Sequence, residues 1–486
     1  MLAAQGYAIA EHPEEADVIL LNTCSVRSHA EERAFGKMGE LSELKAERPD
    51  LVLGIIGCMA KLHQADIFKR LPRVDLVAGP AELYDLPYLL AEVQEKRQLR
   101  GTGNGERVVA VGRQFRPLDH KPKGDYRRPG VTAFVTIMEG CDKACTYCIV
   151  PKTRGQEISR PAEEIISEIR NLVEAGYQEV TLLGQNVNSY GKRFPDGSGY
   201  KGPLGRLRLL EENPDVLLDF PQLLRMIDAA IQDQIGGGSC RCATPAVLAP
   251  PQPPARRSLR AAGGLRSAPP ATNPPLRLRF TTSHPFDAHE RLFEAIRDCP
   301  SVCEWLHLPV QSGSNRILRA MRRGYTAEAY LKKIERLRQL VPDVGLSTDI
   351  IVGFPGETEA DVEATAHLMR QVRYDNAYIF KYSPRPGTDA AAREDDVPRP
   401  VKEERHQALL ALQDGVCRAT HEALVGREVD LLIEEPGRFE GQWFGRTRGH
   451  HGVIIESPDD LLGRTVPARI TRATTHTLFG ILLPTP

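Results

Sequence analysis

The chain contains two successive series in which short apolar runs alternate with helical patterns. In the first series, residues 16–24 and 51–58 are typical of buried strands, and residues 28–46 of the helix between them. The second series has helical patterns such as 161–175 and 358–372 between most of its strands. Its six strands are expected at 131–138, 179–186, 277–283, 304–310, 345–352 and 376–382. Such alternation predicts an α/β protein with parallel strands.

Three further segments interrupt or follow these series. Residues 99–130 are rich in Gly, Arg, Lys and Pro and are interpreted as a linker. Residues 234–275 are dense in Pro, Gly, Ala and Arg and contain no Asp or Glu, which predicts a disordered insertion between a helix at 220–231 and the next strand. After a helix over 401–424, short alternating runs at 428–433, 452–456, 465–470 and 477–482, separated by Gly and Pro, predict a small β-barrel. The expected domains are 1–115, 127–400 and 424–486.

Composition narrows the function classes without choosing among them. The 486 residues are 41% hydrophobic, which is enough for more than one core, and the net charge of −1 does not indicate a nucleic-acid partner. Ten cysteines without a secretory leader favour the reducing cytoplasm, where cysteine clusters bind metals. No apolar run reaches the roughly 18 residues that a membrane helix needs. We expect a cytoplasmic monomer with no membrane partner.

Cys141, Cys145 and Cys148 are the strongest chemical signal in the sequence. Their spacing, C-x3-C-x2-C, can hold three irons of a [4Fe-4S] cluster and leave the fourth iron open for chemistry. A zinc knuckle is the alternative, but structural zinc takes four ligands and no further Cys or His lies within ten residues on either side. The motif resembles that of radical S-adenosylmethionine (SAM) enzymes, in which the open iron binds SAM, and Tyr147 fits the same resemblance.

Cys24 and Cys58 each follow a predicted strand of the first βαβ unit. Because the carboxyl ends of parallel strands meet at one edge of a sheet, the two cysteines are expected to lie near each other. Such an edge is where open α/β sheets bind ligands. Two buried, inert thiols remain the alternative, since free cysteine is among the most buried residue types.

The whole chain resembles the tRNA methylthiotransferases, a branch of the radical SAM enzymes. The resemblance rests on four motifs at strand ends: Leu183–Gly191, Phe280–Pro285, His307–Ser314 and Phe380–Thr388. It implies an N-terminal βαβ cluster-binding domain, a partial (β/α)6 radical SAM barrel and a C-terminal TRAM barrel. It also implies an enzyme that adds a methylthio group to carbon 2 of N(6)-isopentenyladenosine beside the anticodon of tRNA.

The resemblance further implies two [4Fe-4S] clusters and SAM. Cys141, Cys145 and Cys148 would hold the cluster that cleaves SAM, because an unactivated C–H bond needs a cofactor-derived radical. Cys24 and Cys58 match two of the three ligands of an auxiliary cluster that supplies sulfur. The third ligand and the strand before it are not found in this chain, and a start codon assigned too far downstream is the expected reason. The alternative is a chain that holds the auxiliary cluster poorly and loses sulfur insertion. The partners implied are tRNA, an electron donor and a sulfur or cluster carrier.

Five residues at the expected carboxyl-end rim of the barrel are candidate SAM contacts, because an amino acid and a ribose need hydrogen-bond donors and acceptors. They are Gln185, Asn186, Gln311, Ser312 and Asp349. The alternative for each is a role in a structural turn. The Gly353–Glu357 loop could pass under the adenine through its backbone.

For RNA, the sequence offers one basic segment. Arg316, Arg319 and Arg323 fall at i, i+3 and i+7, which predicts one helical face, and Arg322, Lys332 and Lys333 lie nearby. Phosphate contact is one interpretation and a solvated surface the other. The predicted β-barrel at 424–486 has seven Arg and Lys against eight Asp and Glu, so its charge does not support RNA binding.

Two other function classes compete with this interpretation. A SAM-dependent RNA methyltransferase with a structural cluster would need a Gly-rich nucleotide loop in a doubly wound domain, and the sequence shows none. An RNA-binding module with vestigial clusters is the non-enzymatic alternative. Formation of 5'-deoxyadenosine under reducing conditions separates them, because only a radical SAM enzyme makes it.

Overall fold

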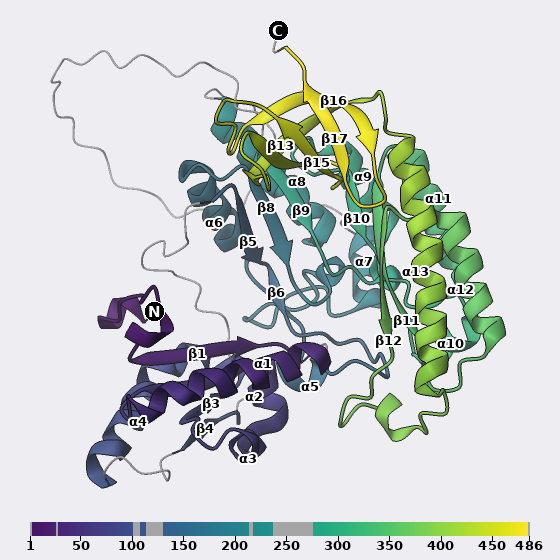
Figure 1. Ribbon diagram of the computed structural model, residues 1–486. Coiled ribbons are helices and arrows are strands. Elements are labelled where there is room, and N and C mark those ends of the chain that lie inside the picture. The colour runs from purple at the N-terminus through teal and green to yellow at the C-terminus, as the bar shows by residue number, and fades with distance from the viewer. Residues whose placement is uncertain are drawn as a thin grey trace, which may run out of the picture.

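The computed structural model describes residues 2–25, 28–100, 107–112, 130–212, 217–236 and 276–484, which fold into three parts (Figure 1). The predicted insertion with Cys240 and Cys242, from residue 237 onward, lies outside the described residues, as does most of the predicted linker. None of the helices formed by the described residues is both long and apolar enough to span a membrane.

The first part is a four-stranded parallel sheet in the order β1-β2-β3-β4. Its strands are β1 (Val18–Thr23), β2 (Val52–Gly57), β3 (Leu76–Ala78) and β4 (Val108–Ala110). Its main helices are α1 (Ser28–Ser42), α2 (Cys58–His63), α3 (Ile67–Arg70) and α4 (Leu86–Arg100). All six residues of β2 are buried, which agrees with the continuous apolar run that predicted this strand.

Strand β4 corrects the prediction that residues 99–130 are only a linker. Its three residues pair with β3, and Val108 is buried in the core on one face of the sheet. A three-residue edge strand is too short to show a period of its own, and the surrounding Gly and Arg dominate the local composition. The pairing partner, rather than the local sequence, makes this segment a strand.

The six predicted strands of the second series are confirmed. They are β5 (Thr132–Thr136), β8 (Glu179–Leu183), β9 (Arg277–Phe280), β10 (Trp305–His307), β11 (Gly345–Val352) and β12 (Asn376–Lys381). The main covering helices are α6 (Ala162–Glu174), α8 (Phe220–Gly236), α9 (Glu290–Asp298), α11 (Ala327–Leu340) and α12 (Glu359–Val372). The strands run parallel, and their carboxyl ends point toward the first part (Figure 1).

The helical periodicity of α6 shows how the outer layer attaches to the strands. Ile165, Ile169 and Leu172 recur at i, i+4 and i+7 and are buried against the inner strands, while the glutamates of the first turn face solvent. On β5, Ala133 and Val135 pack into the same core, whereas the alternating residues point to the other side. The helix ends before Gly176, whose φ of +90° suits glycine.

The six strands form two half-sheets rather than one continuous sheet. One has the order β5-β8-β9 and the other β10-β11-β12. Among the described residues, a single parallel bridge between Leu278 and Val302 joins the two halves. We call this junction the seam. The barrel is therefore partial, with β5 and β12 as its outer edges.

The third part is a closed five-stranded barrel in the order β13-β14-β15-β17-β16. Its strands are β13 (Glu428–Pro436), β14 (Gln442–Thr447), β15 (Gly452–Glu456), β16 (Thr465–Ala473) and β17 (Leu478–Leu482), and α13 (Arg399–Glu422) leads into it. The sequence predicted four of these strands and missed β14. Gly445 weakens the strand pattern there, yet it is needed, since a Cβ at this position would lie 2.4 Å from the Leu432 carbonyl oxygen.

The small barrel lies at the amino ends of the barrel strands (Figure 1). The turn between its strands β14 and β15 contacts both half-sheets across the seam. From one half-sheet, buried Arg279 donates to the carbonyl oxygens of Thr447 and Arg448, each at 2.7 Å. From the other, Glu304 accepts from Arg448 Nε at 2.7 Å and the Val302 carbonyl accepts from Arg448 Nη2 at 2.6 Å. The small barrel and the cysteine loop thus lie at opposite ends of the strands.

Candidate functional site

The Cys141–Cys148 loop follows the β6 residues Met138–Glu139 at the carboxyl end of the first barrel strand. Its backbone is held at both ends: Cys141 N donates to the Gly155 carbonyl at 3.2 Å, and Thr146 N to the Met321 carbonyl at 3.1 Å. Gly140 turns the chain into the loop with a φ of +76°. These hydrogen bonds and the Gly140 turn define the backbone of the loop.

The thiols of Cys141 and Cys148 lie in an environment that disfavours their charged form. Burial raises the pKa of Cys141 to about 12 and that of Cys148 to about 11. Thiolates at these positions need a cation or a metal to stabilise them, and soft sulfur donors suit an iron–sulfur cluster.

Cys145 has two basic neighbours that the sequence did not identify as partners. Arg323 donates through Nη1 to Cys145 Sγ at 3.3 Å, and His284 Nε2 lies 3.8 Å from the same sulfur. Burial and the nearby cations lower the pKa of His284, so this imidazole is neutral. Arg323 is therefore the positively charged neighbour of the Cys145 sulfur. His284 belongs to the Phe280–Pro285 motif and Arg323 to the basic segment, but neither sequence signal identified Cys145 as the partner.

The prediction of one basic helical face through Arg323 is wrong. Helix α10 (Asn315–Ala320) ends after six residues, and Arg322 has a left-handed φ of +54°. The chain therefore leaves the helix before Arg323, which is 5% exposed and also donates to the Pro309 carbonyl at 2.9 Å. Arg316 pairs with Asp361 and Lys333 donates to the Pro285 carbonyl, so neither is a free phosphate ligand.

A cavity of about 980 Å³ opens beside the cysteine loop. Tyr147 and Cys148 form one side of it, and Gln311 and Asp349 another. The end of β12, the loop after it and the start of α13 complete the lining with Phe380, Tyr382, Arg385, Arg399 and Lys402. This volume suits a cofactor of the size of SAM together with a nucleobase.

The structure places the five candidate SAM contacts in different settings. Gln311 and Asp349 line the cavity, and Gln185, Asn186 and Ser312 are not among the described residues that line it. Asn186 Nδ2 donates to Asp287 at 2.6 Å, and Ser312 Oγ accepts from Ser314 N at 3.2 Å. Gln185 Oε1 is buried without a hydrogen-bond partner among the described residues, which leaves it available to a ligand.

Gln311 has a strained backbone at the cavity wall. Its φ is +71°, a region that costs a residue with a Cβ about 1 kcal/mol or more. The conformation is held by hydrogen bonds on both sides, from Gln311 N to the Asp349 carbonyl at 2.8 Å and from Ile351 N to the Gln311 carbonyl at 2.9 Å. Strain of this kind concentrates where a side chain must be aimed at a ligand.

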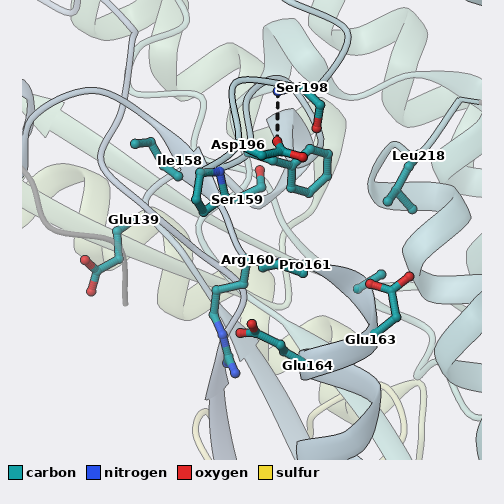
Figure 2. A pocket seen from close by; sticks show the side chains of 13 residues that line it. Glu139, Ile158, Ser159, Arg160, Pro161, Glu163, Glu164, Asp196, Ser198 and Leu218 are labelled. Atoms are coloured by element: carbon teal, nitrogen blue, oxygen red, sulfur yellow. Dashed lines mark hydrogen bonds between the residues drawn. The ribbon is translucent and has the colours of Figure 1, made fainter. Parts of the chain in front are cut away.

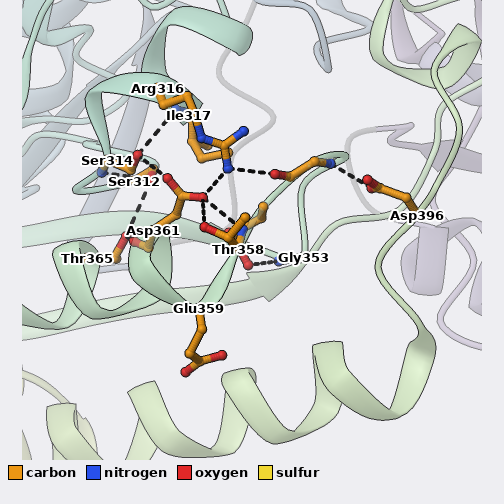
Figure 3. A network of polar contacts seen from close by, with 12 residues as sticks. Ser312, Ser314, Arg316, Ile317, Gly353, Thr358, Glu359, Asp361, Thr365 and Asp396 are labelled. Carbon is orange, nitrogen blue, oxygen red and sulfur yellow. Dashed lines mark hydrogen bonds and ion pairs between the residues drawn. The ribbon is translucent and has the colours of Figure 1, made fainter.

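A network of polar contacts around Asp361 fixes the loop that follows Gln311 (Figure 3). Ser314 Oγ and Thr358 Oγ1 each donate to the Asp361 carboxylate at 2.6 Å, and Arg316 pairs with it. Burial alone would raise the pKa of Asp361, but these three partners hold it well below its usual range. Thr365 Oγ1 accepts from Gly313 N at 2.9 Å and so joins α12 to the same loop.

A second cavity, of about 490 Å³, lies beside the amino end of α6 (Figure 2), and no cysteine is among the described residues that line it. Its lining includes the carboxylates of Glu139, Glu163, Glu164 and Asp196. Arg160 is the basic residue there, and it already pairs with Glu168 at 2.8 Å. A pocket with this charge is unsuited to a polyanion, so the larger cavity is the candidate site.

Cys24 and Cys58 lie at neighbouring strand ends, as predicted. The β1–β2 register pairs Thr23 with Gly57. Cys24 and Cys58 directly follow this pair and therefore lie at the same edge of the sheet. Cys58 is buried and Cys24 exposed. Arg154 of α5 (Val150–Arg154) donates through Nε to Cys58 Sγ at 3.3 Å, which brings an arginine of the barrel to the cysteine of the first part.

Gly140 offers a direct test of the loop geometry. In Gly140→Ala, the new Cβ would lie 2.0 Å from the Gln156 carbonyl oxygen, in a left-handed backbone conformation. We expect a loss of at least about 2 kcal/mol in the free energy of unfolding and less iron after anaerobic reconstitution.

The control is Gly36→Ala, on an exposed face of α1 with nothing within 4 Å of the new Cβ. It should be neutral or stabilising by about 0.5–1 kcal/mol. Chemical denaturation and iron analysis measure both variants. Normal iron binding by Gly140→Ala would show that the loop forms without this turn.

Comparison with family models divides the chain as the three folded parts do. Residues 1–79 match the model described as uncharacterized protein family UPF0004, residues 135–369 the radical SAM superfamily, and residues 422–483 the TRAM domain. The chain also resembles the solved structure of TsrM from Kitasatospora setae, a radical SAM methyltransferase. The TM-score is 0.51 at 15% identity, covering 78% of this chain and 67% of that one, so the similarity concerns the fold.

Curated relatives match over nearly the whole length. A protein of Roseobacter denitrificans is 40% identical over 99% of this chain and 94% of its own, and one of Symbiobacterium thermophilum is 40% identical over 100% of this chain and 90% of its own. Both are named tRNA-2-methylthio-N(6)-dimethylallyladenosine synthase. The chain belongs to this family of radical SAM enzymes.

Proposed function

We propose that this protein adds a methylthio group to carbon 2 of N(6)-dimethylallyladenosine (isopentenyladenosine) in tRNA, next to the anticodon. The observation that supports this most is the placement of a C-x3-C-x2-C loop beside a cavity of about 980 Å³ at the carboxyl ends of the barrel strands. The relatives named for this reaction, 40% identical over nearly full length, give the substrate.

The residues fit a [4Fe-4S] cluster, because three thiols share one anchored loop. Cys141, Cys145 and Cys148 would hold this cluster and leave one iron for SAM. When bound, cluster and SAM supply a 5'-deoxyadenosyl radical, which is reactive enough for an unactivated C–H bond. Arg323 adds a positive charge at Cys145 that offsets the negative charge of the thiolates.

The candidate SAM contacts divide into two roles in this proposal. Gln311 and Asp349 offer an amide and a carboxylate to the amino acid and ribose of SAM, since both line the cavity next to Cys148. Gln185 contributes its unpaired amide oxygen at the same rim. Asn186 and Ser312 already hold neighbouring groups, and we assign them the positioning of the His284 and Gln311 segments.

We assign sulfur supply to an auxiliary cluster at the edge of the first part. Cys24 and Cys58 would supply two of its ligands from neighbouring strand ends, and Arg154 of the barrel donates to Cys58 Sγ at 3.3 Å. The overall reaction replaces the hydrogen on carbon 2 by a sulfur atom that carries a methyl group. It therefore needs an electron donor, a sulfur or cluster carrier and a second SAM as the methyl source.

The cavity also provides groups suited to the RNA. Phe380 and Tyr382 can stack on a nucleobase that has left its helix, and exposed Arg399 lies at the rim where a phosphate would pass. The dimethylallyl group would find apolar contacts with Ile351 and Val397 of the same lining. A flipped adenosine, rather than an intact duplex, is the form that fits such a site.

The test is product analysis after anaerobic reconstitution with iron and sulfide. The protein is given SAM, a reductant and tRNA that carries N(6)-dimethylallyladenosine, and digested tRNA is examined for the added mass of a methylthio group. Formation of 5'-deoxyadenosine is measured in parallel. Consumption of SAM without 5'-deoxyadenosine, or 5'-deoxyadenosine without any modified nucleoside, would contradict the proposal.

A further inference from the structure

A buried ion pair joins the first part of the protein to the wall of the large cavity. Glu31 of α1 is 8% exposed and Arg385, from the loop after β12, is 6% exposed. Arg385 Nη1 donates to Glu31 Oε2 at 3.1 Å, although the two residues are 354 positions apart in sequence. His63 Nε2 lies 3.6 Å from the other carboxylate oxygen of Glu31. We call this arrangement the interdomain pair.

The two ends of the interdomain pair lie next to the two cysteine sites. Arg385 lines the cavity together with Cys148, and Thr388 Oγ1 donates to its carbonyl oxygen at 2.8 Å. Glu31 lies in the first turn of α1, the helix that follows Cys24. The bond between Arg154 and Cys58 is a second joint, at the neighbouring strand end. Both joints connect the edge that carries Cys24 and Cys58 to the carboxyl ends of the barrel.

Breaking the interdomain pair should disturb the docking of the first part onto the barrel. Removing one partner of a buried ion pair leaves an uncompensated charge, which the protein relieves by letting water in. Here the water would enter between the first part and the barrel, because each supplies one of the charges. The adjacent Glu32 differs, since it pairs with Arg70 within the first part and on the surface. Such exposed pairs contribute little to stability.

We propose that Glu31 and Arg385 are positioning residues, whose ion pair holds the Cys24/Cys58 edge at a fixed distance from the large cavity. The inference rests on the proposed function, in which SAM cleavage needs the barrel alone and sulfur insertion needs both parts. Breaking the pair should therefore separate the two activities. Cleavage of SAM continues, while transfer of sulfur to the substrate is lost.

Glu31→Gln is the principal test variant, because Glu31 is not among the described residues that line the cavity. We expect 5'-deoxyadenosine formation and the KM for SAM to change less than about twofold. Methylthiolated product should fall by about 100-fold, because a small displacement of the reacting groups has an effect of this size. Iron content should be unchanged. Protease cleavage between the first part and the barrel should become faster. Glu32→Gln is the matched control and should change none of these quantities.

Arg385 needs a double-mutant cycle, because it also lines the cavity. If it acts through Glu31, the double variant Glu31→Gln/Arg385→Met should lose no more product per 5'-deoxyadenosine than the worse single variant. Additive losses would assign Arg385 a separate role in ligand binding. If Glu31→Gln does not fold, Glu31→Asp keeps the charge with a shorter reach, and the same two readouts apply.

The outcomes distinguish the inference from the function on which it rests. If the wild-type protein makes no methylthiolated nucleoside, the proposed function is refuted. Faster proteolysis of Glu31→Gln would still support the docking role of the interdomain pair. A Glu31→Gln protein with the wild-type ratio of product to 5'-deoxyadenosine overturns the inference while leaving the function intact.

Discussion

Replacing any one of Cys141, Cys145 and Cys148 with alanine is expected to abolish SAM cleavage, the largest effect that we predict. In the proposed function, each thiol is one of only three sulfur ligands on the loop. With two ligands, a cluster cannot present a stable open iron to SAM. The loss should exceed what misfolding explains, because the backbone of the loop is held by hydrogen bonds of Gly155 and Met321 that do not involve the thiols.

The measurements are 5'-deoxyadenosine formation and iron content after anaerobic reconstitution. Iron should fall by about one cluster in each of the three variants. The control is Cys299→Ala, at a buried cysteine of the barrel core outside the loop, which should keep both iron and activity and cost about 1 kcal/mol in stability. Retained 5'-deoxyadenosine production in any of the three loop variants would refute the proposal that these cysteines hold the cluster that cleaves SAM.

Cys58→Ala is expected to give the second largest effect: the loss of methylthiolated tRNA with continued cleavage of SAM. Cys58 is buried, lies at the end of β2 beside Cys24, and accepts a hydrogen bond from Arg154 of the barrel. Without its sulfur, the auxiliary cluster should not assemble, so the substrate radical has no sulfur to receive. The barrel cysteines are untouched, and 5'-deoxyadenosine therefore still forms.

Iron analysis separates this variant from Glu31→Gln. Cys58→Ala should lose iron equivalent to about one cluster, whereas Glu31→Gln should lose none and still lose product. Cys417→Ala, at a buried cysteine on α13, is the control and should behave as wild type in both assays. Full turnover by Cys58→Ala would refute the role assigned to the first part of the chain.

The sequence predicted the elements whose periodicity is strong and local. The apolar run of β2, the helical spacing of Ile165, Ile169 and Leu172, and the turn residues of the small barrel all act through near neighbours in the chain. The three cysteines of the loop were found for the same reason. Strands β4 and β14 were missed because pairing with another strand, rather than their own pattern, makes them strands.

The residues that the sequence did not reveal are those that act across long separations. Arg323 was assigned to an outer helical face, but a left-handed residue before it turns its side chain toward Cys145, 178 positions away. Arg154 and Cys58 are separated by 96 positions, and Glu31 and Arg385 by 354. Charge and spacing alone cannot identify such partners, because the fold determines which face of each segment meets the other.

The docking of the small barrel across the seam changes how a truncation experiment should be interpreted. Its β14–β15 turn bonds to both half-sheets, while the described strands themselves meet at one bridge. Removing residues 424–486 would therefore leave the buried guanidinium of Arg279 without its carbonyl acceptors and weaken the junction between the halves. Inactivity of the truncated protein would be explained equally well by loss of barrel integrity and by loss of RNA affinity. Substitutions on the outer surface of the small barrel, which leave that turn intact, are the variants that can measure RNA binding by itself.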